Sequence, residues 1–186
     1  MTRTVCIFAG ARGKDYLFAD AARICTELVN KGWDIIYGGS SKGVMGACCT
    51  AVKEAGGRIT GVLPRKVYDL KHYDKAIDML VAENMAARKQ HFWDKASAFV
   101  CLPGSYGSMD ELFEVLTLMK LGYLPKRPVA IYNHNGIYTP LIHLFDNMVQ
   151  HGLMDEDRAG LVKFCTTPWA VLDVVNNHAS RGGGHA

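Results

Sequence analysis

Three glycine-rich segments in this 186-residue chain have the composition of phosphate-binding loops. They are Ala9–Gly13, Gly38–Gly46 and Pro103–Ser108, called here the first, second and third loops, and each lies between a strand-like run and a helix-like run. Glycine lets the backbone approach a ligand closely, and the free N–H groups and dipole of the following helix favour a phosphate. One such loop can also be a steric requirement of a tight turn. Three at equivalent positions favour a phosphate site.

The better-known phosphate motifs are absent. None of the three loops matches the dinucleotide-binding pattern G-x-G-x-x-G or the P-loop pattern G-x-x-x-x-G-K-[ST], so a dehydrogenase or a P-loop NTPase is poorly supported. The formal net charge of +3 is scattered along the chain, without a basic run that could follow a nucleic-acid backbone. The expected partner is a small anionic molecule, and no nucleic acid is expected.

Three ordered motifs carry a family resemblance. They read Y-G-G-x-x-x-G-V-M-G at Tyr37–Gly46, M-x-x-R-K at Met85–Lys89, and P-G-x-Y-G-x-x-x-E at Pro103–Glu111. In order and spacing they resemble the signature segments of the LOG (lonely guy) family, the cytokinin riboside 5′-monophosphate phosphoribohydrolases. The resemblance runs from about Val5 to about Leu153, and the motifs are specific in combination.

The resemblance implies a reaction and a set of residues. In that family the glycine loops hold the 5′-phosphate and ribose, and the catalytic pair matches Arg88 and Glu111. The implied reaction is hydrolysis of the N-glycosidic bond of a cytokinin-type, N6-substituted adenine nucleoside 5′-monophosphate, which releases free base and ribose 5-phosphate. A homodimer without a cofactor is implied as well. The implied substrate- and phosphate-binding residues are Gly39, Ser40, Gly43, Met45, Lys89, Gly104, Ser105, Tyr106, Gly107 and Ser108.

The sequence departs from the family pattern at several positions. Ser105 stands in place of the middle glycine of Pro-Gly-Gly, Ser108 in place of a threonine, and Ser40 in place of a third glycine. A serine keeps the hydroxyl that threonine would offer to phosphate. Ala86-Ala87 replace a polar pair, and Asp110 stands where glutamate is common. These changes leave open which base is accepted and how active the enzyme is.

The residue types agree with this chemistry. Breaking an N-glycosidic bond builds positive charge on the ribose, so a carboxylate such as Glu111, in the first turn of its helix, can stabilise the transition state and deprotonate the attacking water. Arginine stays protonated near neutral pH, so Arg88 would hold the carboxylate ionised or contact the phosphate or base. The seven histidines show no metal-ligand spacing, and no metal is expected.

Each of these residues also has a structural interpretation. Ser108-x-x-Glu111 is an S-x-x-E capping box, in which both side chains would satisfy backbone N–H groups at a helix start. Arg88 could lie on a solvated helix face, Tyr106 could fill its loop, and Met45 could belong to the core. For the whole chain, the alternatives are a non-catalytic nucleotide or molybdenum-cofactor carrier and a general AMP phosphoribohydrolase of nucleotide salvage.

The elements that would position these residues alternate along the chain. Short apolar runs typical of buried parallel strands are separated by longer segments with apolar residues at helical spacing. This alternation predicts an α/β fold, a Rossmann-like doubly wound parallel sheet with helices on both faces. The predicted strands are Thr4–Ala9, Asp34–Tyr37, Arg58–Leu63, Asp78–Ala82, Ala98–Leu102, Val129–Tyr132 and Val162–Cys165. The predicted helices are Tyr16–Lys31, Gly43–Ala55, Met85–Lys95, Ser108–Leu121, Tyr138–His151 and Pro168–Asn177.

Length and composition bound the organisation of the chain. With 49% hydrophobic and 21% charged residues, we expect one domain over residues 1–180 and a disordered tail over residues 181–186. The predicted helix Ser108–Leu121 carries apolar side chains around most of its circumference. One buried face would not need so many, so this helix predicts a homodimer, with a fully buried internal helix as the alternative.

The sequence also indicates a compartment. The six cysteines lie in apolar patterns without C-x-x-C, which is typical of reduced core residues. The segment Met1–Gly10 lacks the features of a signal peptide, and no apolar run reaches the length of a membrane span. We therefore expect a cytoplasmic protein without membrane association.

Overall fold

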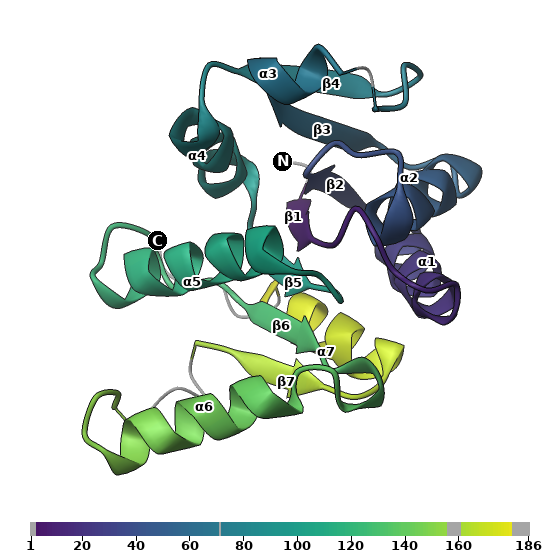
Figure 1. The fold of residues 1–186 in the computed structure, drawn as a ribbon. Helices are drawn as coiled ribbons and strands as arrows, with labels where there is room; N and C mark the ends of the chain where they lie inside the picture. The colour runs from purple at the N-terminus through teal and green to yellow at the C-terminus, as the bar shows by residue number, and fades with distance from the viewer. Residues whose placement is uncertain (1–2, 71, 156–160, 180–186) are drawn as a thin grey trace, which may run out of the picture.

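The computed structural model describes residues 3–70, 72–155 and 161–179, and a parallel sheet runs through them (Figure 1). The described strands are β1 (Arg3–Phe8), β2 (Trp33–Tyr37), β3 (Ile59–Pro64), β4 (Asp78–Ala82), β5 (Ala98–Cys101), β6 (Val129–Tyr132) and β7 (Lys163–Cys165). They are ordered β4-β3-β2-β1-β5-β6-β7, and every neighbouring pair is parallel. The predicted doubly wound α/β sheet is therefore confirmed.

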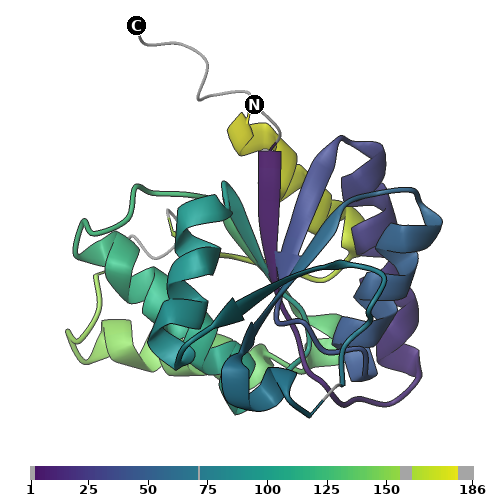
Figure 2. The ribbon, with the colours of Figure 1, turned by 90° about the horizontal axis from the view of Figure 1, so that it is seen from above.

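Helices cover both faces of this sheet (Figure 2). One layer consists of α1 (Tyr16–Asn30), α2 (Gly43–Glu54) and α7 (Pro168–Ala179), and the other of α4 (Met85–Lys95), α5 (Tyr106–Lys120) and α6 (Thr139–Gln150). Alternate strand residues face opposite layers, as the pleat of a strand requires. In β1, Val5 and Ile7 pack with the first layer, and Cys6 and Phe8 pack with the second.

The helix after the third loop begins earlier than the sequence predicts. We expected Ser108 to be its first residue, but α5 begins at Tyr106. The reason is that the Ser105 carbonyl already accepts the N–H of Met109, at 3.1 Å, which closes a helical turn across the loop. Glu111 therefore lies in the second turn of α5, and its expected place in the first turn is wrong.

Two short elements were not predicted: α3 (Arg65–Tyr68) and the 3₁₀ helix η1 (His134–Gly136). They are too short for a helical hydrophobic period to appear in the sequence. The tail expected to be disordered, residues 181–186, lies outside the described residues. No described helix is both long enough and apolar enough to cross a membrane.

The strand order creates one special place in the sheet. β1 pairs with β5, and the chain leaves β1 toward the α1 layer but leaves β5 toward the α5 layer. The direction of winding reverses between these two strands, and open α/β sheets bind ligands outside the carboxyl ends of the strands at such a switch point. The first and third loops are the segments that leave β1 and β5 there.

Candidate active site

Arg88 and Glu111 form a buried ion pair next to this switch point. Nη1 of Arg88, on α4, lies 2.7 Å from Oε1 of Glu111, on α5. Only 9% of Arg88 and 5% of Glu111 is exposed. The Nε–H of Arg88 donates to the carbonyl oxygen of Val62 in β3, at 3.0 Å. The two residues indicated by the family resemblance are thus brought together, and the interpretation of Arg88 as part of a solvated face is wrong.

Neighbouring residues fix the position of the arginine. Asn84 is the N-cap of α4, and its Oδ1 accepts the N–H of Ala87 at 2.9 Å. One turn later, the guanidinium carbon of Arg88 lies 5.0 Å from the centroid of the Phe92 ring. On another side lies Gly38, where an added Cβ would be 2.8 Å from Nη2 of Arg88. A side chain at this position of the second loop would therefore displace the guanidinium or the Met45 Sδ, which lies 2.8 Å from the same Cβ.

Burial dominates the electrostatics of the pair. It raises the pKa of Glu111 above the ordinary value of 4.5, although the positive charge of Arg88 acts in the opposite direction. Burial also raises the pKa of the nearby Cys6 thiol, and the charge of Glu111 adds to that effect. A carboxylate with a raised pKa accepts a proton more readily than an exposed glutamate, which is the property that a general base needs.

The three glycine loops converge at the carboxyl edge of the sheet. The N–H of Gly10 donates to the Pro103 carbonyl at 3.1 Å, which joins the first loop to the third. The Gly10 carbonyl accepts the N–H of Met45 at 3.1 Å, which joins it to the second. Gly43 has a φ of +61° and lies so close to the first loop that a Cβ would be 2.4 Å from the carbonyl carbon of Ala11. The loops therefore form one continuous backbone surface.

Unpaired N–H groups collect on this surface. Among the described residues, the N–H groups of Gly43 and Val44 at the start of α2, and those of residues 105–108 at the start of α5, donate no hydrogen bond. The N–H and hydroxyl of Ser41, by contrast, both donate to the His72 carbonyl at 3.1 Å. Two helix N-termini with unpaired donors give the partial positive charge that suits a phosphate.

The predicted binding residues of the third loop differ in exposure. Tyr106 is 92% exposed, so the interpretation that it fills its loop is wrong. Ser105 and Gly107 are exposed as well. Ser108 is 3% exposed and packs tightly against Gly104, where a Cβ would lie 2.0 Å from the Ser108 Oγ. The structure thus divides these residues into an exposed rim and a buried base.

The predicted residues of the second loop shape its backbone. Gly39 has a φ of +83° and lies against β3, where a Cβ would be 2.8 Å from Cγ of Leu63. The Ser40 hydroxyl accepts the N–H of Lys42 at 3.2 Å, in a turn typical of serine. Met45 is half-buried and packs against the core of the α1 layer, which agrees with its core interpretation.

Lys89 is held by two carboxylates of α5. Its Nζ lies 3.0 Å from Oδ2 of Asp110 and also forms an ion pair with Glu114. Burial alone would lower the pKa of Lys89, but Glu114 and Asp110 raise it above its ordinary value. Both ion pairs tie α4 to α5, and the pair with Asp110 lies one residue away from Arg88 and Glu111. These contacts hold Lys89 between α4 and α5, beside the pair.

The capping-box interpretation of Ser108 and Glu111 is wrong. The N-cap position of α5 is Ser105, and no side chain makes a cap hydrogen bond there. The Glu111 carboxylate instead accepts from Arg88. An S-x-x-E pattern marks a helix start only when its serine lies at the N-cap, and here that serine is the third residue of the helix.

Two positioning residues, Asn84 and Tyr138, escaped the sequence interpretation, and Gly38 was recognised only as part of a glycine loop. Asn84 had a readable signal, because asparagine directly before a helical pattern is a preferred N-cap. The contact between Gly38 and Arg88 depends on tertiary structure and had no signal in the sequence. Neither did the Tyr138 hydroxyl, which accepts the N–H of Gly104 at 3.0 Å. No described group of three or more His, Cys, Asp or Glu side chains is arranged to hold a metal ion.

Comparison with solved structures supports the fold. The molybdenum cofactor carrier protein of Chlamydomonas reinhardtii superposes with a TM-score of 0.75 and 20% identity, covering 97% of this chain and 99% of that one. The molybdenum cofactor binding protein of Rippkaea orientalis gives a TM-score of 0.76 and 16% identity, covering 96% and 98%. At such identities the similarity concerns the fold alone.

Sequence relatives are more informative. Residues 45–175 match a family model described as possible lysine decarboxylase. The cytokinin riboside 5′-monophosphate phosphoribohydrolase LOG of Oryza sativa subsp. japonica is 34% identical over 163 residues, 86% of this chain and 67% of the relative. The corresponding enzyme LOG5 of Arabidopsis thaliana is 35% identical over 155 residues, 82% of this chain and 68% of the relative. With its buried arginine–glutamate pair and glycine loops at the switch point, the chain belongs to the LOG family.

Proposed function

We propose that this chain, a hydrolase of N-glycosyl bonds, cleaves an N6-substituted adenine nucleoside 5′-monophosphate into free base and ribose 5-phosphate. The observation that carries the proposal is the buried pair of Arg88 and Glu111 beside two helix N-termini with unpaired N–H groups. The relatives from rice and Arabidopsis are named for this reaction on cytokinin riboside monophosphates.

The reaction needs a group that stabilises the positive charge developing on the ribose. As the bond between C1′ and the base nitrogen breaks, its electron pair leaves with the base and the sugar becomes cationic. The Glu111 carboxylate stabilises this cation and takes a proton from the water whose oxygen bonds to C1′. That proton passes to the departing base, so the carboxylate is regenerated. The raised pKa of Glu111 suits this exchange of protons.

Arg88 prepares the carboxylate for this role. Its Nη1–H orients one carboxylate oxygen, and its charge opposes the effect of burial on the pKa of Glu111. Because arginine stays protonated, it is not the acid of the reaction. Arg88 is in turn fixed by the Val62 carbonyl, so the carboxylate does not have to reorganise as charge develops.

In this proposal the 5′-phosphate binds to the second and third loops. Binding energy from the phosphate positions the distant scissile bond, so a substrate without phosphate should lose turnover as well as affinity. The test compares release of base from N6-isopentenyl-AMP, AMP and N6-isopentenyladenosine. We expect rapid cleavage of the first, slower cleavage of the second and little of the third. Equal rates on the monophosphate and the matching nucleoside would contradict the phosphate site.

The same assay separates the alternatives. A non-catalytic nucleotide or molybdenum-cofactor carrier would release no base, and it would have no use for the Arg88–Glu111 pair. A general AMP phosphoribohydrolase would cleave AMP as fast as the N6-substituted nucleotide. Lysine decarboxylation is disfavoured because a Schiff-base lysine needs a lowered pKa, whereas Lys89, beside the pair, has a raised one.

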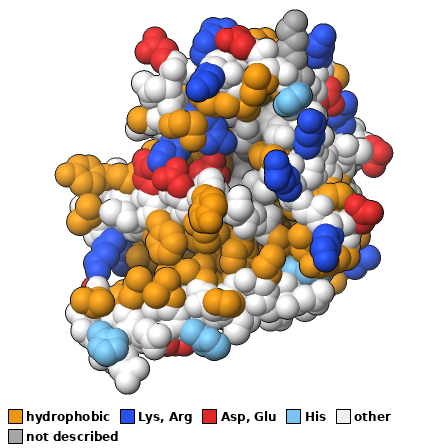
Figure 3. Space-filling model, in the orientation of Figure 1, with side chains coloured by type: hydrophobic (Ala, Val, Ile, Leu, Met, Phe, Trp, Pro, Cys, Tyr) orange, Lys and Arg blue, Asp and Glu red, His pale blue; other side chains and the backbone are white. Residues whose placement is uncertain are grey.

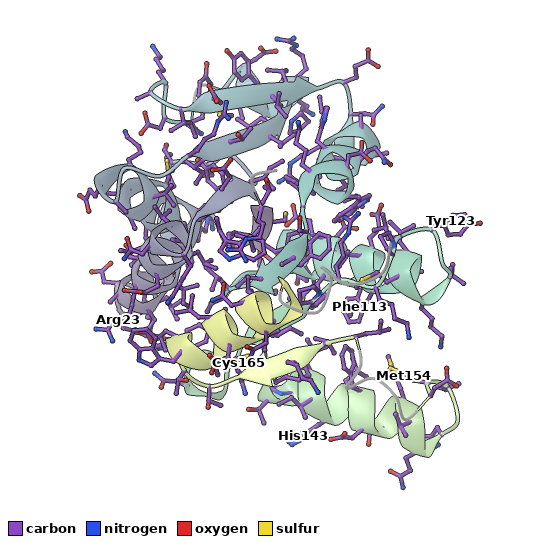
Figure 4. The ribbon with its side chains drawn as sticks, turned by 180° about the vertical axis from the view of Figure 1, so that it is seen from behind. Arg23, Phe113, Tyr123, His143, Met154 and Cys165 are labelled. Atoms are coloured by element: carbon purple, nitrogen blue, oxygen red, sulfur yellow. The ribbon has the colours of Figure 1, made fainter. Side chains whose placement is uncertain are left out.

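We further propose that the enzyme is a cytoplasmic homodimer. A groove between α5 and α6 is lined mostly by apolar side chains, with Lys120, Lys126 and Asp155 among the polar ones, and Figure 3 shows hydrophobic side chains gathered over these helices. Phe113 on α5 and Met154 after α6 line it from opposite sides (Figure 4). An exposed apolar patch of this kind is typical of a protein interface. The cytoplasm is supported by six free, buried cysteines.

A further inference from the structure

The hydroxyl of Tyr138 forms hydrogen bonds to the residues on both sides of Pro103, at the turn where the chain enters the third loop. It accepts the N–H of Gly104 at 3.0 Å and donates to the Leu102 carbonyl at 2.9 Å. Pro103, between them, is held from the other side, because its carbonyl accepts the N–H of Gly10 at 3.1 Å. The conformation of this turn is therefore set by the first loop and by one tyrosine that lies 34 residues from Gly104 in the sequence.

Tyr138 is itself firmly placed. It is 6% exposed, and its backbone N–H donates to Oδ1 of Asn133 at 2.7 Å. Asn133 is also 6% exposed, its backbone N–H donates to the Cys165 carbonyl at 2.8 Å, and its Nδ2 donates to Oγ1 of Thr139 at 3.2 Å. Burial and the neighbouring Cys101 raise the pKa of Tyr138, so its hydroxyl keeps the proton that it donates. A series of buried hydrogen bonds through Asn133 and Tyr138 thus connects the end of β6 to the third loop.

We propose that Tyr138 is a positioning residue for phosphate binding, because its two bonds fix the turn that directs the unpaired N–H groups of residues 105–108. The inference rests on the proposed function, in which those N–H groups bind the 5′-phosphate. Since the hydroxyl already occupies the N–H of Gly104, the phosphate is left with the donors that follow it. Tyr138 does not contact the substrate and acts only through the loop.

The test is Tyr138→Phe, which removes the hydroxyl and keeps the ring. Its matched control is Tyr132→Phe, because Tyr132 is also buried and its hydroxyl donates to Asp20, away from the third loop. Calorimetry with ribose 5-phosphate measures phosphate binding without turnover. Losing an oriented hydrogen bond of this kind typically weakens binding about tenfold. In Tyr138→Phe, but not in Tyr132→Phe, we expect the affinity for ribose 5-phosphate to fall by that factor and KM for the monophosphate to rise by a similar one.

A second readout separates positioning from general stability. Cleavage of N6-isopentenyladenosine, which has no phosphate, should change little in Tyr138→Phe, so that the preference for the monophosphate falls about tenfold. If Tyr138→Phe binds ribose 5-phosphate as tightly as wild type, or loses no more than Tyr132→Phe, the inference is wrong and the proposed function stands. If wild type binds neither ribose 5-phosphate nor nucleoside monophosphates, both are wrong.

Discussion

Nη1 of Arg88 lies 2.7 Å from Oε1 of Glu111, and only 10% and 7% of the two side chains' surfaces are exposed. A buried pair of this kind is weak evidence for stability, because desolvation of the two charges offsets much of their attraction. Its position beside the loops that leave β1 and β5 agrees better with a catalytic role. The carboxylate is held ready by a partner that is itself fixed to β3.

The pH dependence of turnover should report the environment of Glu111. Burial raises its pKa, so the acid limb of kcat at saturating substrate should have its midpoint above 4.5. Arg88→Gln removes the positive charge that opposes burial, so in the residual activity of this variant the limb should move to higher pH. An acid limb of kcat with its midpoint at the ordinary glutamate pKa of 4.5, unchanged in Arg88→Gln, would contradict this assignment.

The same group should affect stability with a defined sign. Because the pKa of Glu111 is higher in the folded state, the folded protein binds this proton more tightly than the unfolded chain does. Its contribution to the free energy of unfolding therefore decreases as pH rises from the unfolded pKa through the folded pKa. Glu111→Gln should flatten that part of the stability profile, as measured by urea unfolding at several pH values.

The glycine at position 38 should be required for the site rather than for the fold. In Gly38→Ala the new Cβ would lie 2.8 Å from Nη2 of Arg88 and from Sδ of Met45, so the guanidinium must shift. We expect turnover to fall about 10²-fold, as for other small misplacements of catalytic groups. Gly32→Ala, between α1 and β2, is the control outside the site, because nothing lies within 4 Å of a Cβ there and its φ of +79° makes the substitution a cost to the fold alone. Equal effects in the two variants would argue against this packing.

Lys89→Met tests whether the lysine clamps the helices or binds phosphate directly. As a clamp between partly exposed carboxylates, its loss should cost about 0.2–1 kcal/mol of stability and raise KM only a few-fold. Lys53→Met is a matched control, because Lys53 pairs with Asp74 on another part of the surface. A rise in KM of about 10²-fold, the size typical of a charged contact to phosphate, would show direct binding instead.

Much of the fold could be predicted because each element carries a local signal. The alternation of apolar runs and helical periods specified the parallel sheet, and Gly32, Gly56 and Gly152, with φ angles of 79°, 70° and 67°, follow helices in the left-handed conformation typical of a glycine at a helix end. The start of α5 was misplaced because Ser105 serves as its N-cap without a side-chain bond, whereas the capping pattern pointed to Ser108.

The candidate site was less predictable, for a physical reason. The pairing of Arg88 with Glu111 was indicated by the family resemblance, since no local pattern joins residues on two different helices. The engagement of Lys89 with Asp110 and Glu114 depends on how α4 and α5 pack, which a sequence period does not specify. Tyr138 reaches the third loop only after β5 and β6 have paired.

The groove between α5 and α6 provides a test of the homodimer. Leu153 lines it and is 75% exposed, so Leu153→Glu should fold normally. A charge buried at an interface is costly, so this variant should dissociate at micromolar concentration, where wild type should scatter light as a particle of twice 20.5 kDa. Leu70→Glu, at a residue 61% exposed outside the groove, is the control. A wild-type particle of 20.5 kDa would contradict the dimer.

The most direct test of the catalytic claim is turnover of N6-isopentenyl-AMP by Glu111→Gln, with thermal unfolding recorded on the same sample. Glutamine has nearly the same shape and can still accept the Arg88 N–H, so we expect the variant to fold. Losing a preorganised charge at the transition state should lower kcat on the order of 10²-fold or more. Wild type should release free base and ribose 5-phosphate in equal amounts. A folded Glu111→Gln variant that turns over at the wild-type rate would show that this carboxylate is structural and that the proposed mechanism is wrong.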